Sequence, residues 1–260
     1  MTVPSRTDRA HRARSFDAAA AQYAANRPSY PPALLDAIEE LAGRPLTGAR
    51  VIDVGAGTGI ATALLHARGA DVLAVEPGDG MAAQFRRTHP DIPIVRGNGN
   101  ALPVATACAD FITYAQAWHW TDPAHSAPEA LRVLRPGGAL ALWWNTTPLD
   151  IPWHMAQARR IERRFGAHPV VEQNGSGARA AQAAAPAGRL AFAGRKVRWS
   201  RRVPIDTHLA NIGSHSLFLV HGKEASTAFL TEERQLLLTA FPDGIVEETY
   251  DVDLLVATTS

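Results

Sequence analysis

Three glycines at fixed spacing, directly after a short β-favouring run, constrain this chain more than any other feature. The run reads Val51-Ile-Asp-Val-Gly-Ala-Gly-Thr-Gly-Ile60, and a helical pattern begins immediately after it. Since glycine has no Cβ, a ligand can approach the backbone of such a turn closely. The following helix start offers free N–H groups and the positive end of the helix dipole. The segment therefore predicts a nucleotide-type pocket between a strand and a helix.

The spacing of these glycines also narrows the class of nucleotide. Dinucleotide-binding folds use the same device with the third glycine five residues after the first. Here Gly59 follows Gly55 by only four residues, and Ile60 occupies the fifth place. This shift points away from NAD.

Composition limits the remaining classes of protein. A chain of 260 residues is expected to form one large domain, or one domain with an insertion. A formal net charge of +1 argues against nucleic-acid binding, and the arginine clusters at 6–14 and 195–202 are assigned to solvated surface. The single Cys108 excludes internal disulfides. With no apolar run near the roughly 20 residues of a membrane span and no signal-like N-terminus, a soluble cytoplasmic protein is expected.

Strand and helix patterns alternate through the middle of the chain. Short loops between them indicate parallel pairing with right-handed crossovers, and hence a doubly wound α/β sheet. In such a sheet a ligand binds at the carboxyl ends of the strands. Strands are predicted at about 50–54, 71–75, 92–95, 109–114 and 138–144, with helices at about 59–68, 79–88 and 124–134 between them.

The flanking regions complete one domain over 15–260, after a flexible N-terminus at 1–14. Residues 15–48 are predicted to form a helical lid, with helices at 15–25 and from Tyr30 to Gly43. Residues 49–145 are predicted to form the cofactor-binding core. Residues 146–195 form an insertion or cap, helical at 151–165 and flexible at 175–188. The C-terminal part, 196–260, is predicted to hold an antiparallel hairpin of strands near 196–204 and 245–257, and a helix at 231–241.

Glu76 ends the second predicted strand, 21 residues after Gly55. A carboxylate at this place can accept hydrogen bonds from both ribose hydroxyls of an adenosine. A solvated acid at the end of a strand is the alternative, but after this glycine loop we favour the ribose contact.

Four motifs in order resemble the class I S-adenosylmethionine-dependent methyltransferases over about residues 15–145, within the type 11 or trans-aconitate-like small-molecule subgroup. The motifs are Asp53-Val-Gly-Ala-Gly-Thr-Gly, Val75-Glu-Pro, Arg96-Gly-Asn-Gly-Asn-Ala-Leu-Pro103 and Leu134-Arg-Pro-Gly-Gly138. Asn98 stands where the family commonly has an aspartate that meets the adenine amino group. Its side-chain oxygen can still accept that bond, without charge assistance.

The resemblance implies a seven-stranded sheet that consists of five parallel strands and the antiparallel hairpin. It also implies S-adenosylmethionine as the cofactor, which methyl transfer converts to S-adenosylhomocysteine. The cofactor-binding residues it implies are Tyr23, Arg27, Asp53, Gly55, Ala56, Gly57, Gly59, Glu76, Pro77, Met81, Asn98, Gly99 and Gln116.

The N-terminal stretch Phe16-Asp17, Tyr23 and Arg27-Pro-Ser-Tyr-Pro31 is similar to the lid of these enzymes. In that resemblance Tyr23 and Arg27 close over the methionine end of the cofactor. A guanidinium suits the cofactor's carboxylate, although pairing of Arg27 with surface acids remains an equal alternative.

Tyr114-Ala-Gln-Ala-Trp-His-Trp120 follows the fourth strand. The resemblance places Trp118, His119 and Tyr30 at the acceptor pocket. Three roles stay open for His119: a base that removes a proton from the acceptor, a donor that orients the acceptor, or a structural ring.

The sequence thus predicts methyl transfer to a small organic acceptor, most readily to oxygen of an aromatic or apolar metabolite, with nitrogen or carbon less favoured. Natural-product biosynthesis suits such a reaction. No metal, nucleic-acid or membrane partner is expected, and the oligomeric state cannot be read from the chain. Two rivals remain: an NAD(P)-dependent oxidoreductase, which would share the glycine loop and the acid, and a protein that binds S-adenosylmethionine without catalysis.

Overall fold

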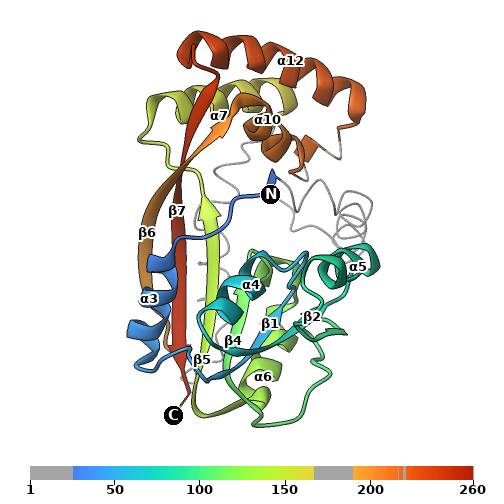
Figure 1. The fold of residues 1–260 in the computed structure, drawn as a ribbon, viewed down its shortest axis with the longest axis vertical. Coiled ribbons are helices and arrows are strands. Elements are labelled where there is room, and N and C mark those ends of the chain that lie inside the picture. Colours follow the sequence, from blue (N-terminus) through green and yellow to red (C-terminus); the bar gives the residue numbers. More distant parts are fainter. Residues whose placement is uncertain (1–25, 167–189, 216, 219–220, 260) are drawn as a thin grey trace.

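The computed structural model of the protein describes residues 26–166, 190–215, 217–218 and 221–259 (Figure 1). The flexible N-terminus predicted at 1–14, the helix predicted at 15–25 with Tyr23, and the flexible stretch predicted at 175–188 all lie outside these residues.

The described strands form one seven-stranded sheet in the order β3-β2-β1-β4-β5-β7-β6. Strands β1 to β5 pair in parallel, whereas β7 is antiparallel to both of its neighbours, β5 and β6. This is the doubly wound sheet with a C-terminal antiparallel hairpin that the sequence predicts. The strands are β1 Arg50–Val54, β2 Asp71–Glu76, β3 Ile94–Arg96, β4 Ala109–Ala115, β5 Leu134–Thr146, β6 Ala193–Pro204 and β7 Ile245–Thr258.

Helices cover both faces of the sheet because alternate strand residues point to opposite sides. Val51 packs in one cluster with α3 and α4, whereas Ile52 packs in another with α6. Helix α5 lies on the same face as α4, and its Phe85 side chain packs in one cluster with Ala74 of β2. The bounds of these helices are α3 Pro32–Ala42, α4 Ile60–Ala67, α5 Asp79–Thr88 and α6 Pro123–Val133.

The helix α3 belongs to the core of the domain. Proline at its first position and a left-handed Gly43 at its end fix its limits. Leu34 and Ile38 are completely buried against the sheet. The helix contacts the strands β5, β7 and β6 (Figure 1). The second helix of the predicted lid is therefore packed on a sheet face, because its apolar stripe is buried there.

A helical cap lies beyond the carboxyl ends of the parallel strands, and the long strands β5, β6 and β7 reach it (Figure 1). It contains α7 Pro152–Phe165, α10 Ile205–Gly213 and α12 Lys223–Ala240. The cap has its own apolar cluster, which includes Ile161, Leu209 and Phe229. None of the helices in the described ranges is long and apolar enough to cross a membrane.

The chain runs outward from β1 through β2 to β3 and then crosses back to β4, on the other side of β1. The neighbouring ends of β1 and β4 are therefore the point where the strand order reverses. Ligands of doubly wound sheets bind at this position, so the segments that follow β1, β2 and β4 define the candidate site.

Candidate active site

The glycine loop begins where β1 ends. The backbone N–H groups of Gly55 and Ala56 both donate to the carbonyl of Val75, at 2.8 and 3.2 Å. Gly55 has φ +69°, and a Cβ at this residue would lie 2.6 Å from the Cβ of Ala117. Glycine is thus required at this position by the close approach of the segment that follows β4.

The other two glycines of the loop differ in what surrounds them. Gly59 has φ +95°, and a Cβ there would lie 2.5 Å from the ring of His89. Gly57 has φ +58°, yet a Cβ there would meet no atom within 4 Å. Gly57 is therefore the member of the motif whose missing side chain leaves open space for a ligand.

Glu76 is buried, with 6% of its surface exposed. One carboxylate oxygen, Oε2, accepts the N–H of Gly57 at 2.8 Å, and Oε1 accepts the N–H of Gly78 at 2.7 Å. A carboxylate has about four acceptor sites on its two oxygens, so a group in this position can accept hydroxyl donors as well as backbone N–H groups. The acid is hydrogen-bonded to the glycine loop and lies beside the open space at Gly57. This position suits a carboxylate that binds the hydroxyls of a ribose.

Asp53 lies beneath the loop and is completely buried. Its two oxygens accept the hydroxyls of Thr62, at 2.5 Å, and Thr113, at 2.8 Å. Desolvation raises the pKa of Asp53 to about 6, and the two threonine hydrogen bonds oppose that rise. Asp53 thereby links β1 to α4 and β4, and both of its oxygens are already hydrogen-bonded inside the protein.

The segment predicted to meet the adenine follows β3. Asn98 is exposed, and its Oδ1 accepts the N–H of Asn100 at 3.0 Å. Gly99 is buried, and a Cβ there would stand 2.8 Å from the hydroxyl of Tyr114. The absence of a side chain at 99 therefore lets this turn pack on the end of β4.

Two further predicted cofactor residues lie around the start of α5. Pro77 is exposed directly after Glu76, and its carbonyl accepts a hydrogen bond from Arg96. Met81 is buried in the first turn of α5. Arg96 also donates from Nε to the carbonyl of Glu76 at 3.1 Å, so it fastens the end of β3 to the turn that carries the acid.

Gln116 holds the segment after β4 against β5. It adopts φ +56°, a left-handed conformation that is uncommon for a residue with a side chain. Its N–H donates to the carbonyl of Trp143 at 2.9 Å, and its Nε2 donates to the carbonyl of Asn145 at 3.2 Å. Such strain at the end of a strand is a common property of functional sites.

Of the three N-terminal candidates, the structure describes Arg27 and Tyr30, whereas Tyr23 lies outside the described residues. The guanidinium of Arg27 lies 3.5 Å from the carbonyl of Ser214, just after α10. Tyr30 is buried and meets Trp143 edge to face, with ring centroids 5.8 Å apart. Their assignments to the cofactor and the acceptor stay predictions, as does that of Tyr23.

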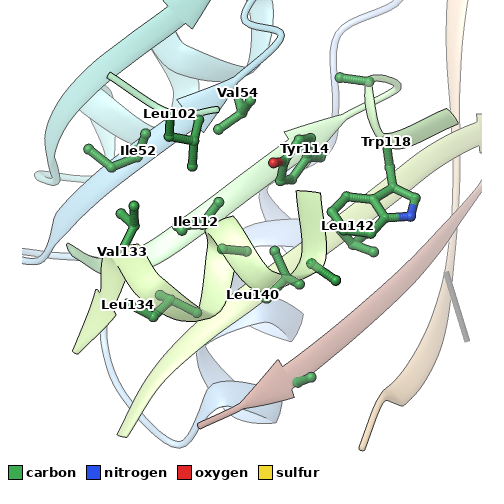
Figure 2. Packing of buried hydrophobic residues seen from close by; sticks show 14 of the residues in the cluster. Ile52, Val54, Leu102, Ile112, Tyr114, Trp118, Val133, Leu134, Leu140 and Leu142 are labelled. Atoms are coloured by element: carbon green, nitrogen blue, oxygen red, sulfur yellow. The ribbon is translucent and has the colours of Figure 1, made fainter. Parts of the chain in front are cut away.

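The aromatic residues directly after β4 differ in exposure: Trp118 is buried, Trp120 is half-buried and His119 is exposed. Trp118 is 1% exposed and packs edge to face on Tyr114, with ring centroids 4.9 Å apart. Figure 2 shows both rings inside the cluster formed with β4, β5 and α6. His119 is exposed, and its Nδ1 lies 3.3 Å from Nε1 of Trp144. In this structure the accessible ring is thus His119.

Several of these contacts had no signal in the sequence. Thr113 pairs with Asp53 across β1 and β4, and only the strand register brings the two together. Arg201 belongs to a cluster assigned to solvated surface, yet its Nε donates to the buried Glu248 at 2.6 Å. That assignment is wrong for Arg201, because the residue is paired with Glu248 across β6 and β7, which places both side chains on the same face of the sheet. Among the described residues, no three His, Cys, Asp or Glu side chains gather to hold a metal.

Comparison with known proteins agrees with this geometry. Residues 52–142 match a family described as a methyltransferase domain. An uncharacterized methyltransferase of Mycobacterium tuberculosis is 34% identical over 225 residues, 86% of each chain. A demethylmenaquinone methyltransferase of Beutenbergia cavernae is 39% identical over 117 residues, 45% of this chain and 47% of that protein.

Among solved structures, a candidate type II methyltransferase from Anaeromyxobacter dehalogenans has the same fold, with a TM-score of 0.63 and 24% identity over 90% of this chain and 96% of that one. Residues 52–142, which match the methyltransferase family, contain the glycine loop, Glu76 and the segment after β4. These are the groups that the fold brings to the carboxyl ends of the strands. The chain belongs to the class I S-adenosylmethionine-dependent methyltransferases.

Proposed function

We propose that the protein transfers the methyl group of S-adenosylmethionine to an oxygen of a small aromatic or otherwise apolar molecule. The observation that carries the cofactor site is the Glu76 carboxylate, held by the N–H groups of Gly57 and Gly78 beside the open side of Gly57. The relative named for demethylmenaquinone supports a small apolar acceptor. Transfer to nitrogen or carbon is the less favoured form of the same reaction.

The residues present fit this cofactor. Glu76 would hold the ribose, the turn at Asn98 and Gly99 would meet the adenine, and the loop from Gly55 to Gly59 would hold the amino-acid end. When bound, the sulfonium supplies an electrophilic methyl group. The protein's own task is then to fix the acceptor in line and to exclude water, and positioning of this kind supplies much of the rate in displacement reactions.

The acceptor is proposed to bind over the ends of β4 and β5, where His119 is exposed beside Trp144. A near-neutral chain gives little attraction for a nucleic acid. A small metabolite suits these features better as the acceptor. Such a reaction would be a tailoring step of biosynthesis in the cytoplasm, and it would need no metal. Membership of the methyltransferase family disfavours the NAD(P)-dependent oxidoreductase.

The proposal is tested with purified protein, methyl-labelled S-adenosylmethionine and a panel of phenols, carboxylic acids, amines and activated carbon acids. Release of S-adenosylhomocysteine together with a labelled phenol or acid would support the proposal. Tight binding of the cofactor with no turnover on any compound would favour the non-catalytic alternative. Saturable binding of NADH in place of S-adenosylhomocysteine would contradict the proposal altogether.

A further inference from the structure

The ring of His119 is fixed by a neighbouring strand. His119 lies in the single 3-10 turn η1 Trp118–Trp120, which follows β4. Nε1 of Trp144, on the adjacent strand β5, lies 3.3 Å from Nδ1 of His119. Trp144 is 5% exposed and packs in the cluster beneath η1. The indole is therefore held by packing, and it determines which edge of the imidazole faces inward.

This contact determines where the imidazole carries its proton. An indole Nε1 can only donate a hydrogen bond, so Nδ1 of His119 must accept and its lone pair is occupied. In a neutral imidazole the other nitrogen then carries the hydrogen. His119 thus presents Nε2–H, a donor, and has no free lone pair with which to take a proton.

Protonation of the ring is disfavoured at the same time. A second N–H at Nδ1 would face the indole N–H of Trp144 and break the hydrogen bond. Desolvation by the protein also lowers the pKa of His119 to about 4, although the residue is exposed in part. Both effects favour the neutral imidazole at physiological pH.

We propose that Trp144 holds His119 as the Nε2–H tautomer, and that His119 binds an oxygen of the methyl acceptor as a hydrogen-bond donor instead of acting as the general base. This inference rests on the proposed function and deepens it. The acceptor would carry an oxygen able to take a hydrogen bond, such as a phenolate or a carboxylate. Trp144 is a positioning residue that acts through His119.

The tautomer is read without any ligand, by long-range ¹H–¹⁵N correlation of protein labelled at histidine, with the signals of His119 assigned from the variant H119Q. We expect a protonated Nε2, an unprotonated Nδ1 and no titration of the ring between pH 6 and 8. In W144F the two tautomers should mix and the imidazole pKa should rise. W143F is the matched control, because Trp143 is a buried neighbour on the same strand whose ring packs against Tyr30, in a different apolar cluster from that of Trp144. A protonated Nδ1, or titration near pH 6.5 in the wild type, would overturn the assignment.

Activity separates a donor from a base. A glutamine amide nitrogen can take the place of Nε2–H, whereas an asparagine reaches only as far as Nδ1. With an acceptor found in the panel above, H119Q should keep most of the kcat/KM and the pH profile of the wild type. H119F should lose roughly 10- to 100-fold, the range for a hydrogen bond to a charged oxygen.

Three results would overturn this role: H119F as active as the wild type, H119N more active than H119Q, or an acidic limb of the pH profile that H119Q removes, since a general base loses its activity when it is protonated at low pH. If the wild type binds S-adenosylhomocysteine but methylates no compound, the proposed function and the acceptor contact both fail. The spectra still show in that case whether Trp144 sets the tautomer.

Discussion

At the scale of single residues, Glu76 has a structural role beside the ribose-binding role proposed for it. Each of its oxygens accepts one backbone N–H, from Gly57 in the loop after β1 and from Gly78 in the loop after β2. The side chain proposed to hold the ribose therefore also fixes the spacing of the two loops that enclose the cofactor. Its removal should affect affinity more than folding, because both loops keep their other contacts.

Replacing Glu76 with alanine should weaken the binding of S-adenosylhomocysteine by more than tenfold, or about 1.5–3 kcal/mol for a charged acceptor. Isothermal titration calorimetry measures this change. Glu39→Ala is the control. Glu39 also accepts a backbone N–H, that of Leu46, but it lies on α3, away from the carboxyl ends of the parallel strands. Equal affinities of the wild type and Glu76→Ala would refute this assignment of the pocket.

The open side of Gly57 gives a second prediction at this scale. In Gly57→Ala the new methyl group would occupy the free space beside the loop, and the dissociation constant for S-adenosylhomocysteine should rise at least tenfold. Gly137→Ala is a matched control. Gly137 also has a positive φ, of +72°, with no atom within 4 Å of its missing Cβ, but it lies near the amino end of β5, Leu134–Thr146. Both variants should lose about 1 kcal/mol of stability from backbone strain, and only the first should lose affinity.

At the scale of elements, the buried Asp53 joins β1, α4 and β4 through two threonine hydroxyls. Its pKa is raised, so the folded state binds the proton more tightly than the unfolded chain does. Stability from this group is therefore present at low pH and is lost as the pH rises from about 4 to 6. A shift of this size corresponds to about 3 kcal/mol.

Denaturant unfolding across pH 3–7 tests this effect. The free energy of unfolding of the wild type should fall relative to that of Asp53→Asn over that interval. Asp110→Asn is a control of opposite sign. Burial raises the pKa of Asp110, but the N–H of Arg50 and the guanidinium groups of Arg44 and Arg135 lower it overall, so its contribution is lost as the pH falls. Parallel curves for Asp53→Asn and the wild type would show that Asp53 is not perturbed.

The elements that carry the cofactor motifs were predictable from the sequence, because their signals are local. The strand predicted at 50–54 has those bounds in the structure, and so has the helix predicted at 79–88. The cap was less predictable. Helix α12 begins at Lys223, eight residues before the predicted start, and α10 was missed although Ile205, Leu209 and Ile212 have helical spacing.

The site was predictable only in part, for a physical reason. Glycines and a strand-end acid have conformational and chemical requirements that are visible in the sequence. The contact between Trp144 and His119 depends instead on the pairing of β4 with β5, and the burial of Trp118 depends on the packing of α6 against the sheet. No spacing along the chain encodes either of these relations.

At the scale of the whole molecule, a buried ion network connects the hairpin to the cap. Glu248 on β7 accepts hydrogen bonds from Arg201 on β6 and from His208 on α10, each at 2.6 Å. Burial raises the pKa of Glu248, but the bonds and charges of His208 and Arg201 lower it to about 2. The network therefore fixes the cap that covers the strand ends, and its contribution to stability is lost as the pH falls from about 4.5 toward 2.

Glu248→Gln should destabilise the protein by about 3–5 kcal/mol, because Arg201 would remain without its buried counter-charge. Glu247→Gln is the adjacent control. Glu247 is exposed, and its carboxylate accepts the hydroxyl of Ser200, so its loss should change stability by less than about 0.5 kcal/mol. Urea unfolding gives both values, and equal effects of the two changes would disprove a structural role for the network.

In the proposed cofactor site, the loop after β1 and the acid that ends β2 bind S-adenosylmethionine together. Calorimetric titration of the full chain with S-adenosylhomocysteine, beside the same titration of Glu76→Ala, tests it most directly. We expect saturable heat for the wild type, with one ligand bound per chain, and a dissociation constant more than tenfold higher for the variant. Folded wild-type protein that gives no heat with either S-adenosylhomocysteine or S-adenosylmethionine would contradict it.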